Sequence, residues 1–154
     1  MRRYVAVCGP SVATEEQTAW AEEVGRRLAE AGATLVCGGL GGVMDAAARG
    51  AKQAGGMAVG ILPGDSRTGA SPHLTVAVPS GMGEARNALV VRAADAVIAI
   101  DGEFGTLSEI ALALKMGKPV VGLATWDLSR GGEDPVTQTE TPEQAVALAL
   151  DAAG

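Results

Sequence analysis

The sequence has 154 residues, of which 47% are hydrophobic, 19% are charged and only 3% are aromatic. This is enough apolar material for one hydrophobic core but not for two, so we expect residues 1–154 to form a single domain. The net charge of −6 disfavours nucleic acid as a partner. No stretch reaches the roughly 18 consecutive apolar residues of a membrane span, and the first residues lack the pattern of a signal peptide. We therefore expect a cytoplasmic protein with no membrane association.

Short apolar runs alternate with amphipathic segments along the chain. The predicted strands are, in chain order, Tyr4–Cys8, Thr34–Cys37, Met57–Leu62, residues 74–78, Ala96–Ile100 and Val120–Leu123. The predicted helices cover residues 14–31, 44–54, 84–93, 106–116 and Pro142–Ala152, and two polar loops cover residues 63–72 and 124–140. Thr14 with Gln17, and Thr141 with Gln144, have the spacing of capping boxes, which supports the starts of the first and last helices.

Most of the predicted strands are apolar throughout and do not alternate with polar residues. This pattern is typical of strands that are covered on both faces, as in a mostly parallel sheet. The alternation of strands and helices predicts an α/β fold: a Rossmann-like, doubly wound sheet of about six or seven strands with helices on both faces. In such folds the loops that follow the strands often form the rim of a ligand site.

Two of the predicted strand-to-helix turns are rich in glycine. Glycine lets backbone N–H groups approach an anion, and the following helix adds unpaired N–H groups and the positive end of its dipole. We expect both turns to bind the phosphate of a nucleotide or a similar ligand, although either could be a tight turn without a ligand. The residues concerned are Gly38, Gly39, Gly41, Gly42 and Met44 in the first turn and Gly102, Glu103, Phe104, Gly105 and Thr106 in the second.

Common nucleotide and metal motifs do not fit the sequence. Neither glycine turn has the G-x-G-x-x-G spacing of a dinucleotide site, and no P-loop motif is present, so an NAD enzyme or a P-loop NTPase is disfavoured. Cys8 and Cys37 belong to no metal-binding pattern and are expected to be buried thiols. We predict no metal and no resident cofactor.

Arg86 and Glu109 are the side chains best placed to act on a ligand beside these turns. Arg86 lies at the start of a predicted helix, and Glu109 lies three residues after Thr106. An arginine offers a forked donor to phosphate, and a glutamate beside a sugar can stabilise positive charge or activate water. Each also has an ordinary interpretation: Arg86 could be a solvated charge at a helix end, and Glu109 could be a common first-turn glutamate. Ser11 is a candidate donor or a plain turn residue, and Trp126 could stack on a base or pack at the rim.

These motifs resemble the LONELY GUY family of nucleoside-monophosphate phosphoribohydrolases, once labelled lysine decarboxylases. The family combines a GG-x-x-GLM segment, an arginine-containing helix and a PGG-x-GT-x-x-E loop, which are similar to residues 38–44, to Arg86 and to residues 102–109. The resemblance implies that Arg86 and Glu109 are a catalytic pair and that residues 102–106 hold phosphate. A pyridoxal-phosphate decarboxylase is excluded, because none of the three lysines lies in a suitable loop.

The sequence departs from the family pattern at three positions. Asp101 replaces a proline, Glu103 replaces a glycine, and Asn87 stands where a lysine follows the arginine. Two carboxylates beside a phosphate site lower its affinity for a dianion. The chain therefore looks like a divergent branch, which is also similar to molybdenum-cofactor carrier proteins. We keep Asn87 as an expected binding residue and Asp101 as a possible one.

Two functions are therefore expected. The first is hydrolysis of the N-glycosidic bond of a nucleoside 5′-monophosphate, with Glu109 stabilising the oxocarbenium-like transition state and Arg86 positioning the substrate and pairing with Glu109. The alternative is a carrier or sensor that binds a nucleotide or phosphorylated pterin without cleaving it. In either case the partner is a small phosphorylated ligand, and the resemblance implies a homodimer or homotetramer.

Overall fold

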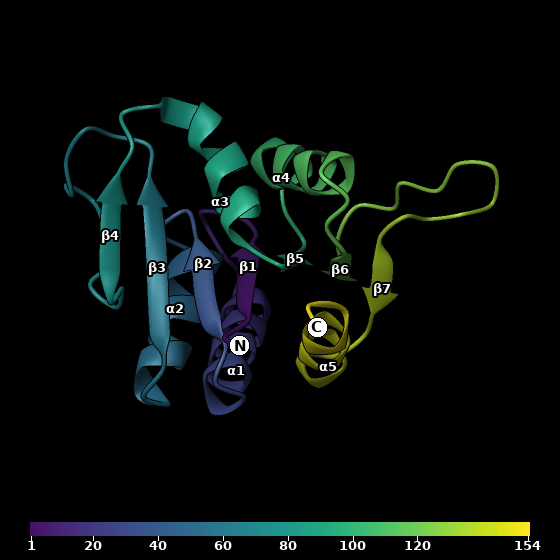
Figure 1. The fold of residues 1–154 in the computed structure, drawn as a ribbon, viewed down its shortest axis with the longest axis horizontal. Helices are drawn as coiled ribbons and strands as arrows, with labels where there is room; N and C mark the ends of the chain where they lie inside the picture. Colours follow the sequence, from purple (N-terminus) through teal and green to yellow (C-terminus); the bar gives the residue numbers. More distant parts are fainter.

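A computed structural model describes residues 1–154 and consists of one parallel sheet with helices on both sides (Figure 1). The elements are β1 (Tyr4–Cys8), α1 (Glu15–Glu30), β2 (Thr34–Cys37), α2 (Val43–Gln53), β3 (Met57–Leu62), β4 (Val76–Pro79), the 3-10 helix η1 (Gly83–Arg86), α3 (Asn87–Ala93), β5 (Ala96–Ile100), α4 (Phe104–Lys115), β6 (Val120–Leu123), β7 (Thr137–Thr139) and α5 (Pro142–Ala152). The strand order is β4-β3-β2-β1-β5-β6-β7, and every adjacent pair is parallel. The predicted α/β fold is confirmed.

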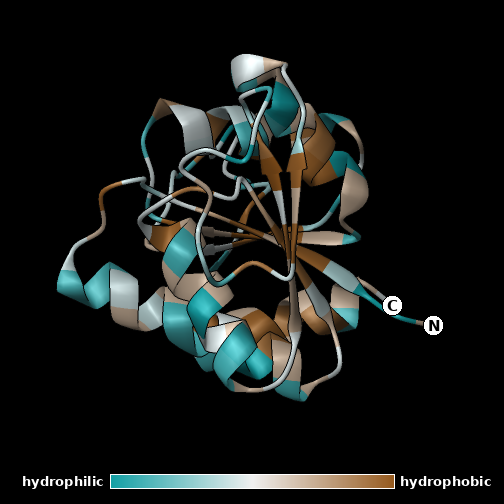
Figure 2. Ribbon diagram, turned by 90° about the vertical axis from the view of Figure 1, so that its left-hand side faces the viewer, coloured by the Kyte–Doolittle hydropathy of each residue, from teal (hydrophilic) through white to brown (hydrophobic).

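Two apolar layers cover the two faces of the sheet. Along β1, Val5 and Val7 point into the layer beneath α1, α2 and α5, whereas Ala6 and Cys8 point into the layer beneath α3 and α4. Figure 2 shows the apolar strands running between helices whose outer surfaces are hydrophilic. Burial on both faces explains why the strand sequences are continuously apolar.

The helix starts follow the predicted capping chemistry. The Thr14 hydroxyl accepts from the Gln17 backbone N–H over 3.1 Å, and the Gln17 side chain accepts from the Thr14 N–H over 3.0 Å. At α5 only half of the predicted box is formed: the Thr141 hydroxyl accepts from the Gln144 N–H over 3.2 Å, but the Gln144 side chain accepts from the Glu140 N–H and not from the Thr141 N–H. At α2 and α4, by contrast, no side chain caps the first turn. Both of these helices follow a glycine turn.

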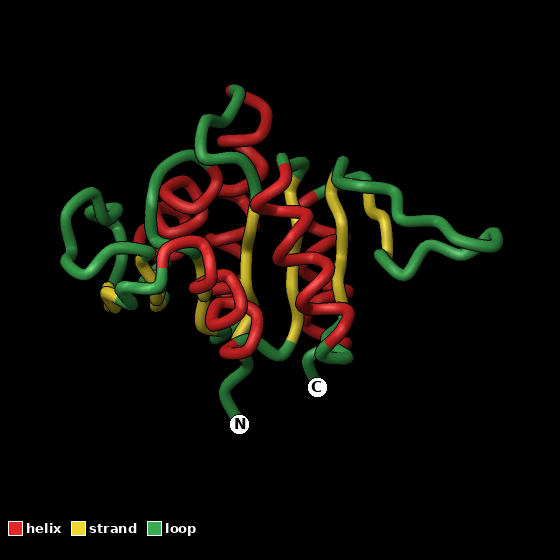
Figure 3. Tube along the Cα trace, turned by 90° about the horizontal axis from the view of Figure 1, so that it is seen from above, coloured by secondary structure: helices red, strands yellow, loops and turns green.

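Several predicted boundaries require correction. The predicted strand 74–78 begins at Val76 and ends at Pro79, and the predicted helix 84–93 begins as η1 before it continues as α3. Helix α4 begins at Phe104, two residues earlier than predicted. The loop predicted over residues 124–140 contains the short strand β7, which is polar and exposed and so gives no apolar signal. The rest of that connection reaches outward from the sheet (Figure 3).

Both cysteines are free and buried, as expected. Burial raises the pKa of the Cys37 thiol to about 12, so it carries no reactive thiolate near neutral pH. None of the helices is both long and apolar enough to cross a lipid bilayer.

The strand order places a topological switch point between β1 and β5. From β1 the chain continues to β2 on one side, whereas β5 lies on the other side and is followed by β6. Connections diverge at such a point, and a crevice forms beyond the carboxyl ends of the two strands. The turns that follow β1, β2 and β5 all leave the sheet at this edge.

Candidate functional site

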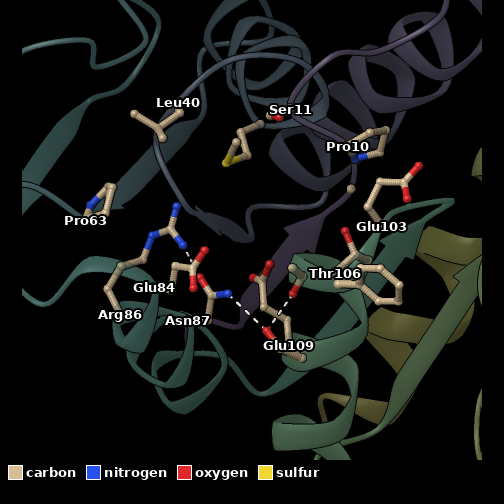
Figure 4. A pocket seen from close by; sticks show the side chains of 15 residues that line it. Pro10, Ser11, Leu40, Pro63, Glu84, Arg86, Asn87, Glu103, Thr106 and Glu109 are labelled. Carbon is tan, nitrogen blue, oxygen red and sulfur yellow. Dashed lines mark hydrogen bonds between the residues drawn. The ribbon is translucent and has the colours of Figure 1, made fainter.

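A cavity of about 470 Å³ lies beyond the switch point (Figure 4). Its volume is within the range of small-molecule sites. It is lined by Gly9, Pro10, Ser11, Leu40, Met44, Pro63, Glu84, Arg86, Asn87, Glu103, Phe104, Gly105, Thr106, Ser108 and Glu109. These residues come from five separate connections, and the structure therefore brings both glycine turns, the predicted arginine and the predicted glutamate to one place.

Arg86 is held in position by the backbone and by its neighbour in the chain. Its Nε donates to the carbonyl of Ile61 over 2.9 Å, and its Nη1 donates to the side-chain oxygen of Asn87. The guanidinium also packs against the first glycine turn, since a Cβ added to Gly38 would lie 2.8 Å from Nη2. Nη2 donates to no protein acceptor, so it remains available to a ligand in the cavity.

Asn87 links Arg86 to the start of α4. Its side-chain nitrogen donates to the Ser108 hydroxyl over 3.1 Å, and that hydroxyl donates to the carbonyl of Gly105 over 2.7 Å. Asn87 is buried and both ends of its amide are used. The network fixes the arginine and the first turn of α4 relative to each other.

Glu109 lies on the floor of the cavity between Arg86 and Thr106, as Figure 4 shows. Burial raises the pKa of its carboxyl group to about 7, and the charge of Arg86 offsets only part of this shift. The expected ion pair between Arg86 and Glu109 is not formed, because no nitrogen of Arg86 lies within 4.0 Å of a Glu109 oxygen. Arg86 is directed to Ile61 and Asn87 instead.

The glycines of the first turn do not line the cavity, but they support residues that do. Gly42 has a φ of 63°, and a Cβ there would lie 2.2 Å from the carbonyl oxygen of Pro10, which accepts from the Val43 N–H. Gly38, Gly39, Gly41 and Gly42 do not line the cavity, whereas Leu40 and Met44 from the same segment do. The glycines allow the turns after β1 and β2 to approach each other, and the N–H groups of Met44 and Asp45 make no hydrogen bond.

The second glycine turn presents its later residues to the cavity. Glu103, Phe104, Gly105 and Thr106 line it, and the N–H groups of the last three have no acceptor. Gly102 lies under Thr106 with a φ of 110° and does not line the cavity. An uncapped helix start of this kind attracts an anion.

Asp101 faces away from the cavity. Its carboxylate accepts from the Gln17 side chain over 2.5 Å, and its carbonyl accepts from the Thr125 hydroxyl over 2.6 Å. Its φ of 47° is inaccessible to proline, which is held near −65°. The Asp101 backbone therefore differs from that of the proline in the resembled motif.

Six lining residues were not among the predicted site residues: Gly9, Pro10, Leu40, Pro63, Glu84 and Ser108. Glu84 and Ser108 stand beside Arg86 and Glu109 in the motif segments, so their position in the sequence was the available signal. The exposed Ser11, a further candidate, does line the cavity. The cavity thus contains three carboxylates and a single cationic side chain, Arg86. No group of three or more His, Cys, Asp or Glu side chains is placed to hold a metal ion.

The chain is similar along its whole length to solved molybdenum-cofactor proteins. It is 35% identical to the molybdenum cofactor binding protein of Rippkaea orientalis, with a TM-score of 0.93 over 100% of this chain and 99% of that one. It is 32% identical to the molybdenum cofactor carrier protein of Chlamydomonas reinhardtii, with a TM-score of 0.88 over 99% and 98% of the two chains. A relative of uncharacterised function from Archaeoglobus fulgidus is 42% identical over 142 residues, or 92% of this chain and 91% of that protein.

These similarities confirm the resemblance that the glycine turns, Arg86 and residues 102–109 suggested. The family match covers nearly the whole chain, from residue 2 to residue 152. On this match, the chain belongs to the SLOG cluster4 family.

Proposed function

We propose that the cavity binds a small phosphorylated ligand and carries it without cleaving it, and that the phosphorylated pterin of the molybdenum cofactor is the leading candidate. The observation that carries the proposal is the position of Arg86. It is the only cationic side chain of the cavity, and it packs against the first glycine turn, whose helix α2 begins with unpaired N–H groups. A guanidinium fork together with helix starts is a suitable receptor for phosphate.

The similarity to molybdenum-cofactor proteins supports the choice of ligand. It extends over both chains almost completely, with TM-scores of 0.93 and 0.88. A carrier has to hold its ligand reversibly, and a site with one arginine facing three carboxylates limits the affinity for a multiply charged anion. This balance favours binding and release.

The second candidate is hydrolysis of a nucleoside 5′-monophosphate to free base and ribose 5-phosphate. The observation that favours it is Glu109, which lies in the cavity beside Arg86. With a pKa of about 7, a large fraction of Glu109 is ionised at neutral pH. The carboxylate form could stabilise an oxocarbenium-like transition state and orient water.

One experiment separates the two functions. The protein is incubated anaerobically with molybdenum cofactor released from a molybdenum enzyme and passed through a gel-filtration column. Molybdenum is measured by mass spectrometry, and the pterin by fluorescence after oxidation. We expect both to elute with the protein and to be lost with Arg86→Ala. Failure of both to co-elute would reject the carrier function.

The same preparation is incubated with AMP and with GMP, and the products are separated by chromatography. Free adenine or guanine that is absent with Glu109→Gln would establish hydrolysis in place of carriage. Intact nucleotides are the expected result for a carrier. A matched Arg92→Ala variant, which changes an exposed arginine of α3 outside the cavity, controls for the loss of positive charge.

We also propose that the chain forms a homodimer or homotetramer. The support is an apolar face of the sheet on β3 and β4, where Met57, Val76 and Val78 are exposed. Sedimentation velocity tests the assembly: a single species of monomer mass at micromolar concentration would contradict it. Val78→Glu is expected to shift the equilibrium toward the monomer, because burying that charge in an interface is costly.

A further inference from the structure

Phe104 is an exposed aromatic side chain at the mouth of the cavity. It is the only phenylalanine of the chain, it is 76% exposed, and it lines the cavity. Large apolar side chains are normally buried. This one is left in solvent although it belongs to the first turn of the helix that borders the site.

Trp126 packs against the Phe104 ring. The ring centroids are 6.0 Å apart with an interplanar angle of 29°, and Trp126 is not a lining residue. The Trp126 indole N–H donates to the carbonyl of Glu103 over 3.3 Å, which ties the pair to the start of α4. The result is a preorganised aromatic pair, of which the exposed Phe104 lines the cavity.

Glu103, the residue before Phe104, is an unpaired acceptor at the same place. It lines the cavity and is exposed, and its carboxylate takes part in no hydrogen bond or ion pair. It occupies the N-cap position of α4 without capping it. An ionised carboxylate only accepts hydrogen bonds, so it suits a ligand edge made of N–H groups.

The charges of the cavity orient a ligand that has an anionic end and a flat ring. Figure 4 shows Arg86 on one side of the cavity and Glu103 with Thr106 on the other. A phosphate is attracted to Arg86 and repelled by Glu103. The uncharged ring of the same ligand is then directed toward Glu103 and Phe104.

We propose that Phe104 and Glu103 form a ring subsite, in which Phe104 stacks on a flat heteroaromatic ring and Glu103 accepts hydrogen bonds from its N–H and amino groups. This inference rests on the proposed binding of a phosphorylated ligand at Arg86 and adds a ring preference to it. A ring with a 2-amino group beside a ring N–H fits the carboxylate, as in a pterin or guanine. Adenine lacks this edge.

Three probes with one phosphate test the subsite by calorimetric titration: GMP, AMP and ribose 5-phosphate, each checked by chromatography for integrity. GMP and AMP share the stacking surface, and only GMP has the amino and N–H edge. Ribose 5-phosphate has neither. We expect each step, from ribose 5-phosphate to AMP and from AMP to GMP, to strengthen binding about tenfold.

The variants assign these steps to residues. Phe104→Ala is expected to weaken GMP and AMP about tenfold and to leave ribose 5-phosphate unchanged, whereas Phe104→Tyr retains the stacking. Glu103→Ala is expected to abolish the preference for GMP over AMP. Glu84→Ala, which removes another carboxylate of the cavity, is the matched control and keeps the preference. Phe104 and Glu103 are exposed, so these changes leave the core intact.

The outcomes distinguish this inference from the proposed function. If all three probes bind equally well and Phe104→Ala changes none of them, the ring subsite is wrong while phosphate binding stands. An equal affinity for GMP and AMP would reject the role of Glu103. If neither these probes nor a phosphorylated pterin binds, the proposed function fails and the subsite with it. Magnetisation transfer from the Phe104 ring to the GMP base protons is the direct signature of stacking.

Discussion

Arg86 and Glu109 line the same cavity without forming an ion pair. Asn87 occupies one donor of the guanidinium and Ile61 another, so the arginine is fixed away from the glutamate. Glu109 consequently lacks a close positive partner, and burial raises the pKa of its carboxyl group to about 7. The charge of the cavity therefore changes with pH in the neutral range.

Ligand affinity is expected to follow this titration. A bound phosphate adds negative charge near Glu109 and so favours its protonated form, which means that binding takes up a proton above pH 7. Affinity for ribose 5-phosphate should rise as the pH falls from 8.5 to 7, by at most about tenfold per unit. Calorimetry in buffers of different ionisation enthalpy measures the proton uptake. Glu109→Gln is expected to bind with no uptake in this range, and an unchanged uptake in that variant would contradict the assignment.

The stability of the free protein should depend on the same group. The folded-state pKa of Glu109, about 7, lies above the ordinary glutamate pKa of 4.5, so the folded state holds more protons than the unfolded state between these values. The free energy of unfolding should therefore fall as the pH rises from 4.5 to 7, by about 3 kcal/mol at most. Glu109→Gln has no carboxyl group to ionise, so this loss of stability with rising pH should be absent from the variant. In urea unfolding, its advantage over the wild type should be largest at pH 8 and vanish near pH 4.5, and an equal advantage at both pH values would contradict the prediction.

The apolar runs were sufficient to predict the fold because strands buried on both faces need continuous apolar sequence. Six of the seven strands have apolar runs, including the edge strand β4, whose Val76 and Val78 are exposed. Strand β7 was missed because its three residues are polar and pair only with β6. The boundary of α4 was missed for a related reason. The exposed Phe104 lies outside the buried stripe of α4, which consists of Thr106, Ile110 and Ala113.

Only part of the site could be predicted from the sequence. The motif spacing brought together Arg86, Thr106 and Glu109, because residues that follow parallel strands meet at one edge of the sheet. The orientation of Asp101 depends on its positive φ and on Gln17 of α1, which lies 84 residues earlier in the chain. The glycines of the first turn were expected to touch phosphate, but their lack of side chains serves the close approach to the turn after β1. Such contacts between segments that are distant in the chain leave no local pattern in the sequence.

Arg86 is expected to dominate the affinity for phosphate. Arg86→Ala removes the only cationic side chain of the cavity, and a charge-assisted hydrogen bond contributes about 1.5–3 kcal/mol, so binding of ribose 5-phosphate should weaken about 10- to 100-fold. Arg92→Ala is the matched control on α3 and should change the affinity for ribose 5-phosphate less than twofold. Arg86→Lys should recover only part of the affinity, because the ammonium cannot keep the fork held by Ile61 and Asn87. Equal effects of Arg86→Ala and Arg92→Ala would show that only overall charge matters.

Asn87 should affect affinity by positioning Arg86. Asn87→Ala leaves Nη1 of Arg86 without its acceptor and the Ser108 hydroxyl without its donor, so binding should weaken about tenfold and unfolding should become about 1–3 kcal/mol easier. Ser108→Ala breaks the same network at the other end and keeps the contact between Arg86 and Asn87. It should change affinity less than threefold. A loss of affinity with Ser108→Ala as large as with Asn87→Ala would indicate that the start of α4, and not the arginine, is what Asn87 maintains.

The two glycines of the second turn should respond in opposite ways to alanine. Gly102 has a φ of 110°, and a Cβ there would lie 2.3 Å from the Thr106 Cβ, so Gly102→Ala combines backbone strain with steric overlap and should lower the free energy of unfolding by about 2 kcal/mol or more. Gly105 is in the first turn of α4 with open space around its Cβ position, so Gly105→Ala should be neutral or stabilise by up to about 1 kcal/mol. Urea unfolding at pH 7 compares the variants directly. Normal stability of Gly102→Ala would show that the turn does not depend on its glycine.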